Sequence, residues 1–450
     1  MPATHKQNAP ESKGGGVRIL SLAIAMIVLD TSLSAVAMPV IAERLGVSAP
    51  VAMWIAGAYS LAAATMLLPA AALGQSWGYR ATFRAGLILS IAASFACALA
   101  PGATFLIVAR LLQGIGSAAV FAVNGPLLRF SYAPEALGRG LGFNALIVAG
   151  FTAASPSIAA GVLSIGEWPW LFVIAQPLGL IALIGTRALS EPPIERARFD
   201  LIGAVLASLA LGLALGALFV MARAGISAAA VAALVAGVAG TIALVRQQWH
   251  QPRPVIPLPL LRIPLLQSAY AASICAFTGQ GLAMLALPFL LHDRHRFDLA
   301  EVGVLVTAWP VGTAVVATFS GRLADRLTPH LVAGSGMLLA AIAIVLAALA
   351  PLGNAAALAT CLALAGAGFA LFQVPNNKEM FARAPVQHSA GAGGMQGLCR
   401  LIGQTLGAAG AALAFRLSGS DSLAPLLASA AVMLAAATIC THRVLRGAPA

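Results

Sequence analysis

The sequence is poor in charged residues: Asp, Glu, Lys and Arg make up only 9% of its 450 residues, whereas hydrophobic residues make up 60%. A soluble domain carries about 25% charged residues, because its surface must be solvated. The composition therefore excludes a soluble globular protein of this length. It indicates an all-α polytopic membrane protein.

The chain also lacks the residue patterns of several enzyme and metalloprotein classes. It has no nucleotide-binding P-loop, no metal-ligand spacing and no hydrolase triad, so we expect neither an enzyme nor a bound cofactor or metal. Its five cysteines fall in apolar runs without a C-x-x-C pair, which is typical of small core residues. Its seven histidines lie in loops or at segment ends, which argues against a histidine proton relay inside a membrane.

The net charge of +12 would indicate a nucleic-acid partner in a soluble protein. Here the basic residues lie mostly in short loops between apolar segments, where they set membrane topology. We therefore expect no nucleic-acid partner, and we place the chain in the inner (plasma) membrane with both termini in the cytoplasm. All but seven of the 26 basic residues then face the cytoplasm; the exceptions are Arg44, Arg223, Arg294, Arg296 and Arg416 outside, and Arg110 and Arg400 within segments.

Apolar segments of about twenty residues, the length that crosses a bilayer as a helix, recur along the whole chain. Short polar stretches or Gly/Pro breaks separate them. Fourteen segments are predicted, at 18–40, 51–73, 82–101, 103–130, 138–163, 168–189, 200–221, 226–246, 264–291, 300–320, 331–351, 354–377, 388–415 and 423–441.

The segments form two sets of six with a pair between them. A motif that begins with glycine and ends with arginine follows the second segment, at residues 74–80. A similar motif follows the second segment of the second set, at residues 321–326. Duplicated halves that face one another are transporter architecture. The predicted organisation is a cytoplasmic N-terminal tail (1–17), an N-terminal six-helix bundle (18–189), cytoplasmic linkers with two spacer helices (190–263), a C-terminal six-helix bundle (264–441) and a cytoplasmic C-terminal tail (442–450).

Asp30 stands near the middle of the first segment, and it is the only acidic residue that we place deep inside a segment. A carboxylate at that depth costs roughly 3 kcal/mol on insertion scales, so a functional role is the default hypothesis. The alternative is a packing role in which Asp30 forms hydrogen bonds with Thr31 or Ser34.

Two arginines, Arg110 and Arg400, also lie at membrane depth. At about 1.5 Å per residue, Asp30 and Arg110 lie at similar depths, so they can form an ion pair that holds Asp30 charged until a proton or a cationic substrate intervenes. Arg110 could instead tether helices or reach outward to the membrane surface. Arg400 could bind an anionic group or hold Gln373 or Asn376 across a central cavity. The candidate cavity residues are Asp30, Arg110, Gln113, Asn124, Arg400 and Gln404.

Four motifs follow one another in a specific order along the chain. They are L-D-T-S-L-S-A-V-A-M-P at 29–39, A-R-L-L-Q-G-I-G at 109–116, W-P-W-L-F at 168–172 with Q-P-L-G at 176–179, and the glycine-rich stretch with Arg400 and Gln404 at 394–407. Together they resemble the major facilitator superfamily, and specifically its fourteen-helix drug:proton antiporter family. The resemblance implies a major facilitator fold of two six-helix bundles plus two spacer helices, and it implies that Asp30 and Arg110 couple transport to protons.

The family's conformational motifs are present with departures. Where the family carries an acidic residue followed by arginine after the second helix, this chain has Gln75 and Ser76. We expect this neutral pair to weaken the cytoplasmic latch of the first half relative to the second, because it offers no charge-assisted hydrogen bond. The residues that match the motifs are Gly74, Gly78 and Arg80, their second copy Gly321, Asp325 and Arg326, and Pro156 of the fifth-helix motif.

We therefore expect a secondary active transporter that couples proton movement to the efflux of small amphipathic compounds, such as drugs or quaternary ammonium ions, by rocking of its two halves. Its partners would be a small-molecule substrate, protons and the lipid bilayer, and the unit would be a monomer. Two arginines against one aspartate leave an excess of positive charge, so the alternative is a metabolite or organic-anion transporter of the same fold. A membrane-embedded enzyme or receptor would need catalytic or sensing features that the sequence lacks.

Overall fold

The computed structural model describes residues 14–131, 137–189, 200–248, 258–385 and 389–445. Every regular element in these ranges is a helix. Thirteen helical stretches are long and apolar enough to cross a membrane, and α6 (Leu137–Ile165, 29 residues) supplies the remaining predicted segment. The predicted all-helical architecture of about fourteen segments is therefore confirmed.

The N-terminal half contains six predicted segments and more than six helices. They are α1 (Gly14–Val36), α2 (Met38–Arg44), α3 (Ala49–Trp77), α4 (Tyr79–Ala98), α5 (Ala103–Ser131), α6, α7 (Trp170–Val173), α8 (Gln176–Gly185) and the short helix η2 (Thr186–Ala188).

The spacer region and the C-terminal half follow. The spacer region contains α9 (Leu201–Ala224), α10 (Ala228–Gln248) and α11 (Leu258–Leu261). The C-terminal half contains α12 (Pro264–Phe289) with its π-helical end η3 (Leu290–Arg294), α13 (Leu299–Arg326), α14 (Pro329–Ala348), α15 (Ala355–Arg383), α16 (Ser389–Ser418) and α17 (Ala424–Leu445).

Two predicted segments are interrupted where a proline begins a new helix. The first segment is divided at Ala37, and Pro39 occupies the first turn of α2. The sixth is divided between α7 and α8, and Pro177 occupies the first turn of α8. Proline is favoured in a first turn because the N–H that it lacks would have no helical partner there.

One predicted boundary is wrong in a way that matters. The twelfth segment was expected to end at residue 377. The helix α15 instead continues to Arg383 and carries Glu379 as a buried acid within a membrane-length helix. Glu379 lies near the end of its helix, whereas Asp30 lies well inside the first predicted segment.

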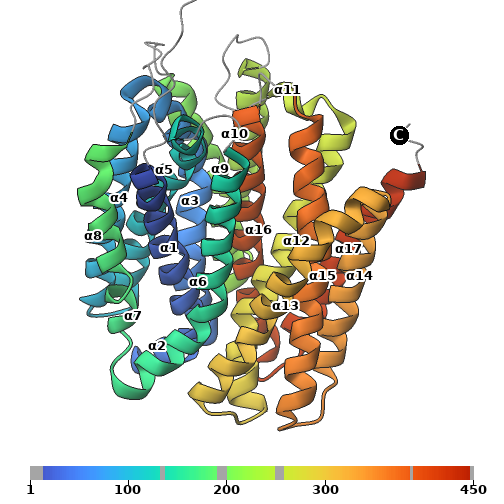
Figure 1. The fold of residues 1–450 in the computed structure, drawn as a ribbon. Coiled ribbons are helices and arrows are strands. Elements are labelled where there is room, and N and C mark those ends of the chain that lie inside the picture. The colour runs from blue at the N-terminus through green and yellow to red at the C-terminus, as the bar shows by residue number, and fades with distance from the viewer. Residues whose placement is uncertain (1–13, 132–136, 190–199, 249–257, 386–388, 446–450) are drawn as a thin grey trace, which may run out of the picture.

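The helices form two bundles that lie side by side (Figure 1), with α3 packed against α16 and α6 packed against α13 across the boundary. The contact between α6 and α13 is close because Gly303 has no side chain. A Cβ atom at Gly303 would lie 2.8 Å from the carbonyl oxygen of Pro156. Four residues further along α13, the hydroxyl groups of Ser157 and Thr307 lie 3.2 Å apart.

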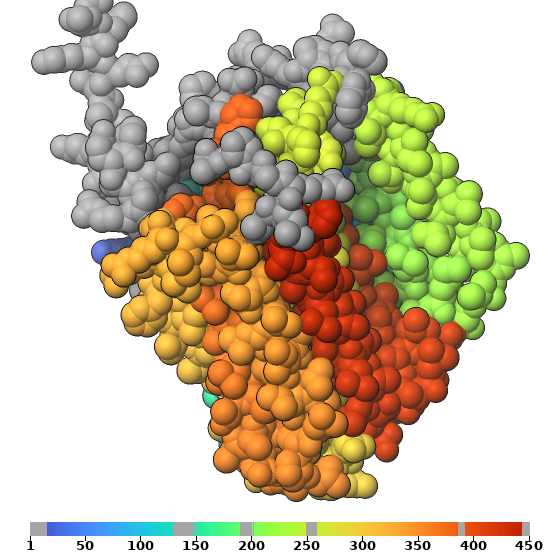
Figure 2. All heavy atoms as spheres, turned by 90° about the vertical axis from the view of Figure 1, so that its right-hand side faces the viewer, coloured from blue at the N-terminus to red at the C-terminus, as the bar shows by residue number. Residues whose placement is uncertain are grey.

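The spacer helix α9 contacts both bundles. It packs against α3 and α16, and the ring of Phe219 lies 4.6 Å from that of Trp54 on α3. At its far end, Arg416 of α16 donates a hydrogen bond to the carbonyl oxygen of Met221 at 3.1 Å. Figure 2 shows the green spacer helices as a layer beside the red helices at the end of the chain.

Close helix contacts confirm the internal duplication. In the N-terminal half, a Cβ at Gly116 of α5 would lie 2.8 Å from the carbonyl oxygen of Gly86 on α4. In the C-terminal half, Gly368 of α15 meets Gly336 of α14 in the same way. Two residues earlier, each helix has another glycine that packs against a third helix. Gly114 of α5 contacts the carbonyl oxygen of Tyr59 on α3, and Gly366 of α15 contacts that of Trp309 on α13. The G-x-G at 114–116 thus has its structural equivalent at 366–368.

We predict that Gly116→Ala lowers the thermal unfolding midpoint of the purified protein, whereas Gly125→Ala on the same helix leaves it unchanged or raises it slightly. A methyl group at Gly116 would meet backbone atoms of α4, and overpacking of this kind costs about 1–3 kcal/mol. Gly125 has no atom within 4 Å of the added methyl, so only the gain in helix propensity remains. Equal midpoints for the two variants, measured by intrinsic fluorescence, would contradict the packing described here.

Candidate functional site

Asp30 lies inside the N-terminal bundle and not at its surface: the residue is only 3% exposed. Its neighbours in sequence do not hold it. The hydroxyl of Thr31 donates to the carbonyl oxygens of Ile27 and Val28, and that of Ser34 donates to the carbonyl oxygen of Thr31. The alternative in which Thr31 or Ser34 binds the carboxylate is therefore wrong. The partners of Asp30 come from other helices.

Two side chains of α5 bind the same carboxylate oxygen. Arg110 Nη1 lies 3.3 Å from Asp30 Oδ2, and Gln113 Nε2 donates to that oxygen at 2.6 Å. Arg110 also donates to Gln113 Oε1 at 2.7 Å. Because Arg110 and Gln113 are three residues apart, one face of α5 presents both groups to α1. The approach of Asp30 and Arg110 that their depths predicted is found.

Two further helices complete the network. Ser94 of α4 accepts a hydrogen bond from Gln113 Nε2 at 2.7 Å. On the other side, Gln176 at the start of α8 has its Nε2 3.5 Å from Asp30 Oδ1 and donates to the carbonyl oxygen of Phe172 at 2.8 Å. Helices α1, α4, α5 and α8 therefore all contribute to holding one carboxylate.

Aromatic rings cover the guanidinium of Arg110. Its Cζ lies 4.8 Å from the centroid of the Tyr59 ring and 5.8 Å from that of Phe172. Asp30, Arg110 and Gln113 are each at most 3% exposed. In such an apolar site a charge is stable only when it is paired, so the charge of Asp30 and the position of Arg110 depend on one another. A proton that reached Asp30 would remove the anion and release the guanidinium.

The described residues of the C-terminal half form no equivalent of this network. The two halves can be aligned by placing Gly114 and Gly116 of α5 on Gly366 and Gly368 of α15. In this alignment Leu362 and Ala365 occupy the positions of Arg110 and Gln113, and Trp309 occupies that of Tyr59. The rings of Trp309, Phe277 and Phe372 surround Phe369 there, with centroids 5.4 to 6.4 Å from its own. The duplicated scaffold therefore carries a polar site in one half and an aromatic cluster in the other.

The remaining candidate cavity residues lie apart from Asp30. Arg400 of α16 has its Cζ 5.0 Å from the centroid of the Phe121 ring on α5, so it faces the N-terminal half. Gln404 lies one turn further along α16 and is partly exposed. Asn124 of α5 is 9% exposed, and its Oδ1 has no hydrogen-bond partner among the described residues. Asn376, which the sequence offered with Gln373 as a partner of Arg400, donates to Ser273 Oγ at 2.8 Å on α12.

The conformational motif differs between the halves as the sequence suggested. The hydroxyl of Ser76 donates only to carbonyl oxygens of its own helix, at Ala72 and Leu73, and Gln75 is exposed. Asp325, by contrast, forms an ion pair with Lys378 of α15.

The other motif residues lie at helix ends and contacts. Gly78 links α3 to α4 with a φ of 106°, which favours glycine, and Gly74 packs against Val123. Arg80 lies in the first turn of α4, Gly321 and Arg326 lie in the last two turns of α13, and Pro156 forms the contact with Gly303.

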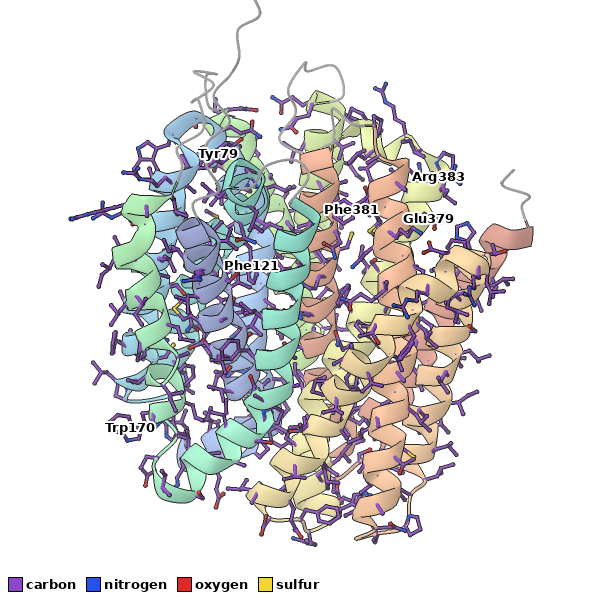
Figure 3. All side chains as sticks on the ribbon, in the orientation of Figure 1. Tyr79, Phe121, Trp170, Glu379, Phe381 and Arg383 are labelled. Atoms are coloured by element: carbon purple, nitrogen blue, oxygen red, sulfur yellow. The ribbon has the colours of Figure 1, made fainter. Side chains whose placement is uncertain are left out.

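The sequence analysis did not predict three buried polar residues as part of a site: Ser94, Gln176 and Glu379. Ser94 carries no sequence signal, because a serine in an apolar segment is common. Gln176 stands in a quoted motif, but its contact with Asp30 depends on how α8 folds back along α1. The Oε2 atom of Glu379 lies 2.9 Å from Nδ1 of His330, and this pair links α15 to α14. Figure 3 shows Glu379 towards the end of the bundle that also carries Arg383 and Tyr79.

Comparisons with known proteins agree on the family. A model of the Major Facilitator Superfamily matches residues 20–247 and 269–449. The chain is 38% identical over 438 residues to "Uncharacterized transporter YebQ" of Escherichia coli (strain K12), with 96% of each chain covered. It is 28% identical over 413 residues to "Multidrug resistance protein Stp" of Mycobacterium tuberculosis (strain CDC 1551 / Oshkosh), covering 89% of this chain and 75% of that protein.

A solved structure shows the same fold. The crystal structure of peptide transporter POT in complex with sulfate superimposes with a TM-score of 0.73, covering 96% of this chain and 94% of that one. The two sequences are 15% identical, so the similarity concerns the fold alone.

We predict that Asp30 and Arg110 are coupled in stability. Arg110→Gln leaves a buried carboxylate without a cation and Asp30→Asn leaves a buried cation without an anion, and each should destabilise the protein by about 3–5 kcal/mol. The double variant leaves neither charge, so it should be no less stable than the worse single variant. Thermal or denaturant unfolding of the four proteins forms a double-mutant cycle. Additive losses would mean that the pair contributes nothing as a pair.

Proposed function

The chain belongs to the Major Facilitator Superfamily, and we propose that it is a proton-coupled exporter of small amphipathic compounds, of the fourteen-helix drug:proton antiporter kind. The observation that supports the proposal is the buried carboxylate of Asp30, held by Arg110 and Gln113 in the N-terminal bundle. An acid at membrane depth that can be neutral or charged is the simplest proton carrier that a helix bundle can offer.

The exchange follows from competition for Asp30. While Asp30 is charged, Arg110 and Gln113 hold α5 against α1 through it. A proton from the outer side neutralises the carboxylate and weakens that attachment. A substrate that disturbs the pair from the inner side would favour proton release. Each event changes the energy of the same contact, so the proton and the substrate oppose one another in the cycle.

The helix α1 can carry this change to the other half. It contacts α5, α6 and α8 in its own bundle and α12 in the C-terminal bundle. The boundary also includes contacts of α3 with α16, α6 with α13, α2 with α12 and α5 with α16. We propose that the halves rock about this boundary, so that substrate access alternates between the two sides of the membrane.

We propose an inner-membrane location with both termini in the cytoplasm, and a monomer as the transport unit. The first residues of α1 and the last residues of α17 lie towards the same end of the bundle (Figure 1). The distribution of Lys and Arg assigns that end to the cytoplasm. The relative named as a multidrug resistance protein supports the export direction.

A metabolite or organic-anion transporter of the same fold is the second candidate. The observation that favours it is Arg400, a cation at membrane depth that has no carboxylate partner among the described residues. Both candidates use the same proton site and differ in the substrate.

The experiment that tests the proposal begins with a growth-inhibition panel in which the gene is deleted and overexpressed. Each compound whose inhibitory concentration rises on overexpression is then assayed for proton-driven flux in membrane vesicles. We predict that Asp30→Asn abolishes gradient-driven flux while insertion into the membrane is retained, because a neutral amide is less costly in the bilayer.

The matched control is Glu379→Gln, which neutralises the other acid buried within a membrane-length helix among the described residues. This variant should retain gradient-driven flux, because Glu379 pairs with His330 and does not contact the Asp30 network. Full proton-driven flux in Asp30→Asn vesicles would rule out the proposed role of Asp30.

A further inference from the structure

Arg400 is a partly exposed cation with a buried, unpaired Nε atom. Its Nε atom is inaccessible and has no hydrogen-bond partner, and no carboxylate among the described residues lies within 4 Å of its guanidinium. The contact that the structure gives it is the face of the Phe121 ring, 5.0 Å away. Arg110, the other arginine at this depth, is paired with Asp30. Of the two arginines, Arg110 therefore has a carboxylate partner and Arg400 has none among the described residues.

A guanidinium cannot avoid this situation by losing its proton, because it stays charged in proteins. An aromatic face offsets part of the cost of burying it. The buried Nε–H group still has no acceptor among the described residues, and a buried donor without a partner is costly. An anion that the chain itself does not supply would remove that cost.

The surroundings of Arg400 resemble one wall of a ligand site more than a packing contact. Gln396, Arg400 and Gln404 follow one another at four-residue intervals and are all partly exposed, so they form a polar stripe along one face of α16. Across the boundary between the halves, Phe121 and Asn124 are three residues apart on α5, and Asn124 Oδ1 is unpaired. Figure 3 shows Phe121 inside the molecule, away from either end of the bundle.

Tyr59 connects this stripe with the proton site. Its ring covers the guanidinium of Arg110 at 4.8 Å. Its hydroxyl is inaccessible and has no hydrogen-bond partner among the described residues. Tyr59 lies on α3, which packs against α16, so the ring that covers Arg110 and the polar stripe with Arg400 lie on neighbouring helices.

We propose that Arg400 is the anion-binding subsite of the transporter and that its substrate is an amphipathic organic acid. The carboxylate would accept from the guanidinium, and the apolar part would lie against Phe121. The inference rests on the proposed function and narrows its substrate class. Export of a monoanion and entry of a proton both carry positive charge inward, so the membrane potential and the proton gradient would drive the same direction.

Equilibrium binding to the purified full-length protein in nanodiscs of zwitterionic lipid tests the proposal, with no proton gradient present. The probes are naphthoate and a trimethyl(naphthyl)ammonium ion, which share a ring and carry opposite charges. Isothermal titration calorimetry should give wild-type protein a roughly tenfold or greater preference for naphthoate. Arg400→Gln should lose that preference through weaker naphthoate binding, with the affinity for the ammonium ion undiminished.

Three further variants make the result specific. Arg400→Lys keeps the charge without the planar fork and should bind naphthoate with intermediate affinity. Arg223→Gln removes one exposed positive charge at the end of α9 and should bind both probes as wild type does. Glu379→Gln, which removes the other buried acid among the described residues, should also bind naphthoate as wild type does. Because binding is measured without a proton gradient, a failure of proton coupling is distinguishable from a failure of this subsite.

Several outcomes would overturn the assignment. They are no naphthoate binding to the wild type, equal naphthoate affinity of wild type and Arg400→Gln, or an equal loss of both probes in that variant, which would indicate a distorted site. Loss of naphthoate binding when anionic lipid replaces part of the zwitterionic lipid would show that a lipid headgroup occupies Arg400 instead of a substrate.

Discussion

The pairing of Asp30 with Arg110 is the constraint on which the N-terminal half depends. Two opposite charges, each almost completely buried, are stable only while they remain together. Gln113, Ser94 and Gln176 add hydrogen bonds around the carboxylate, and Tyr59 and Phe172 exclude other partners from the guanidinium. Any change in the charge of Asp30 must therefore move side chains on several helices at once, which is the property that a coupling site needs.

The two halves share a scaffold and differ in what it holds. The same close glycine contacts position α5 against α4 and α15 against α14. Within that common geometry the N-terminal half places Arg110 and Gln113, and the C-terminal half places Leu362 and Ala365 beside a cluster of aromatic rings. A packed aromatic cluster has one stable arrangement, whereas an ion pair with a protonatable member has two. The described C-terminal half has its own buried pair with a protonatable member, Glu379 and His330, but that pair lies near the end of α15 and outside this common geometry.

Much of this structure could be predicted from the sequence, and the exceptions have physical causes. Segment length and hydrophobicity determine the helices, and depth along two helices is enough to bring Asp30 and Arg110 together. Glu379 was missed because a polar run within a helix resembles a loop when its partner, His330, is distant in sequence. The contact between Gln176 and Asp30 depends on the helix break before Pro177. The surroundings of Arg400 depend on which helices meet at the boundary between the two halves. Tertiary contacts of this kind leave no periodic signal.

The central claim is that Asp30 gains and loses the transported proton. Infrared difference spectroscopy of the full-length protein in nanodiscs, recorded between acidic and alkaline buffer, observes this proton directly. The account predicts a carbonyl stretch of a protonated carboxyl group that appears on acidification in the wild type and in Glu379→Gln, and that is absent from Asp30→Asn. The same band at undiminished intensity in Asp30→Asn would show that another group carries the proton, and it would contradict the account.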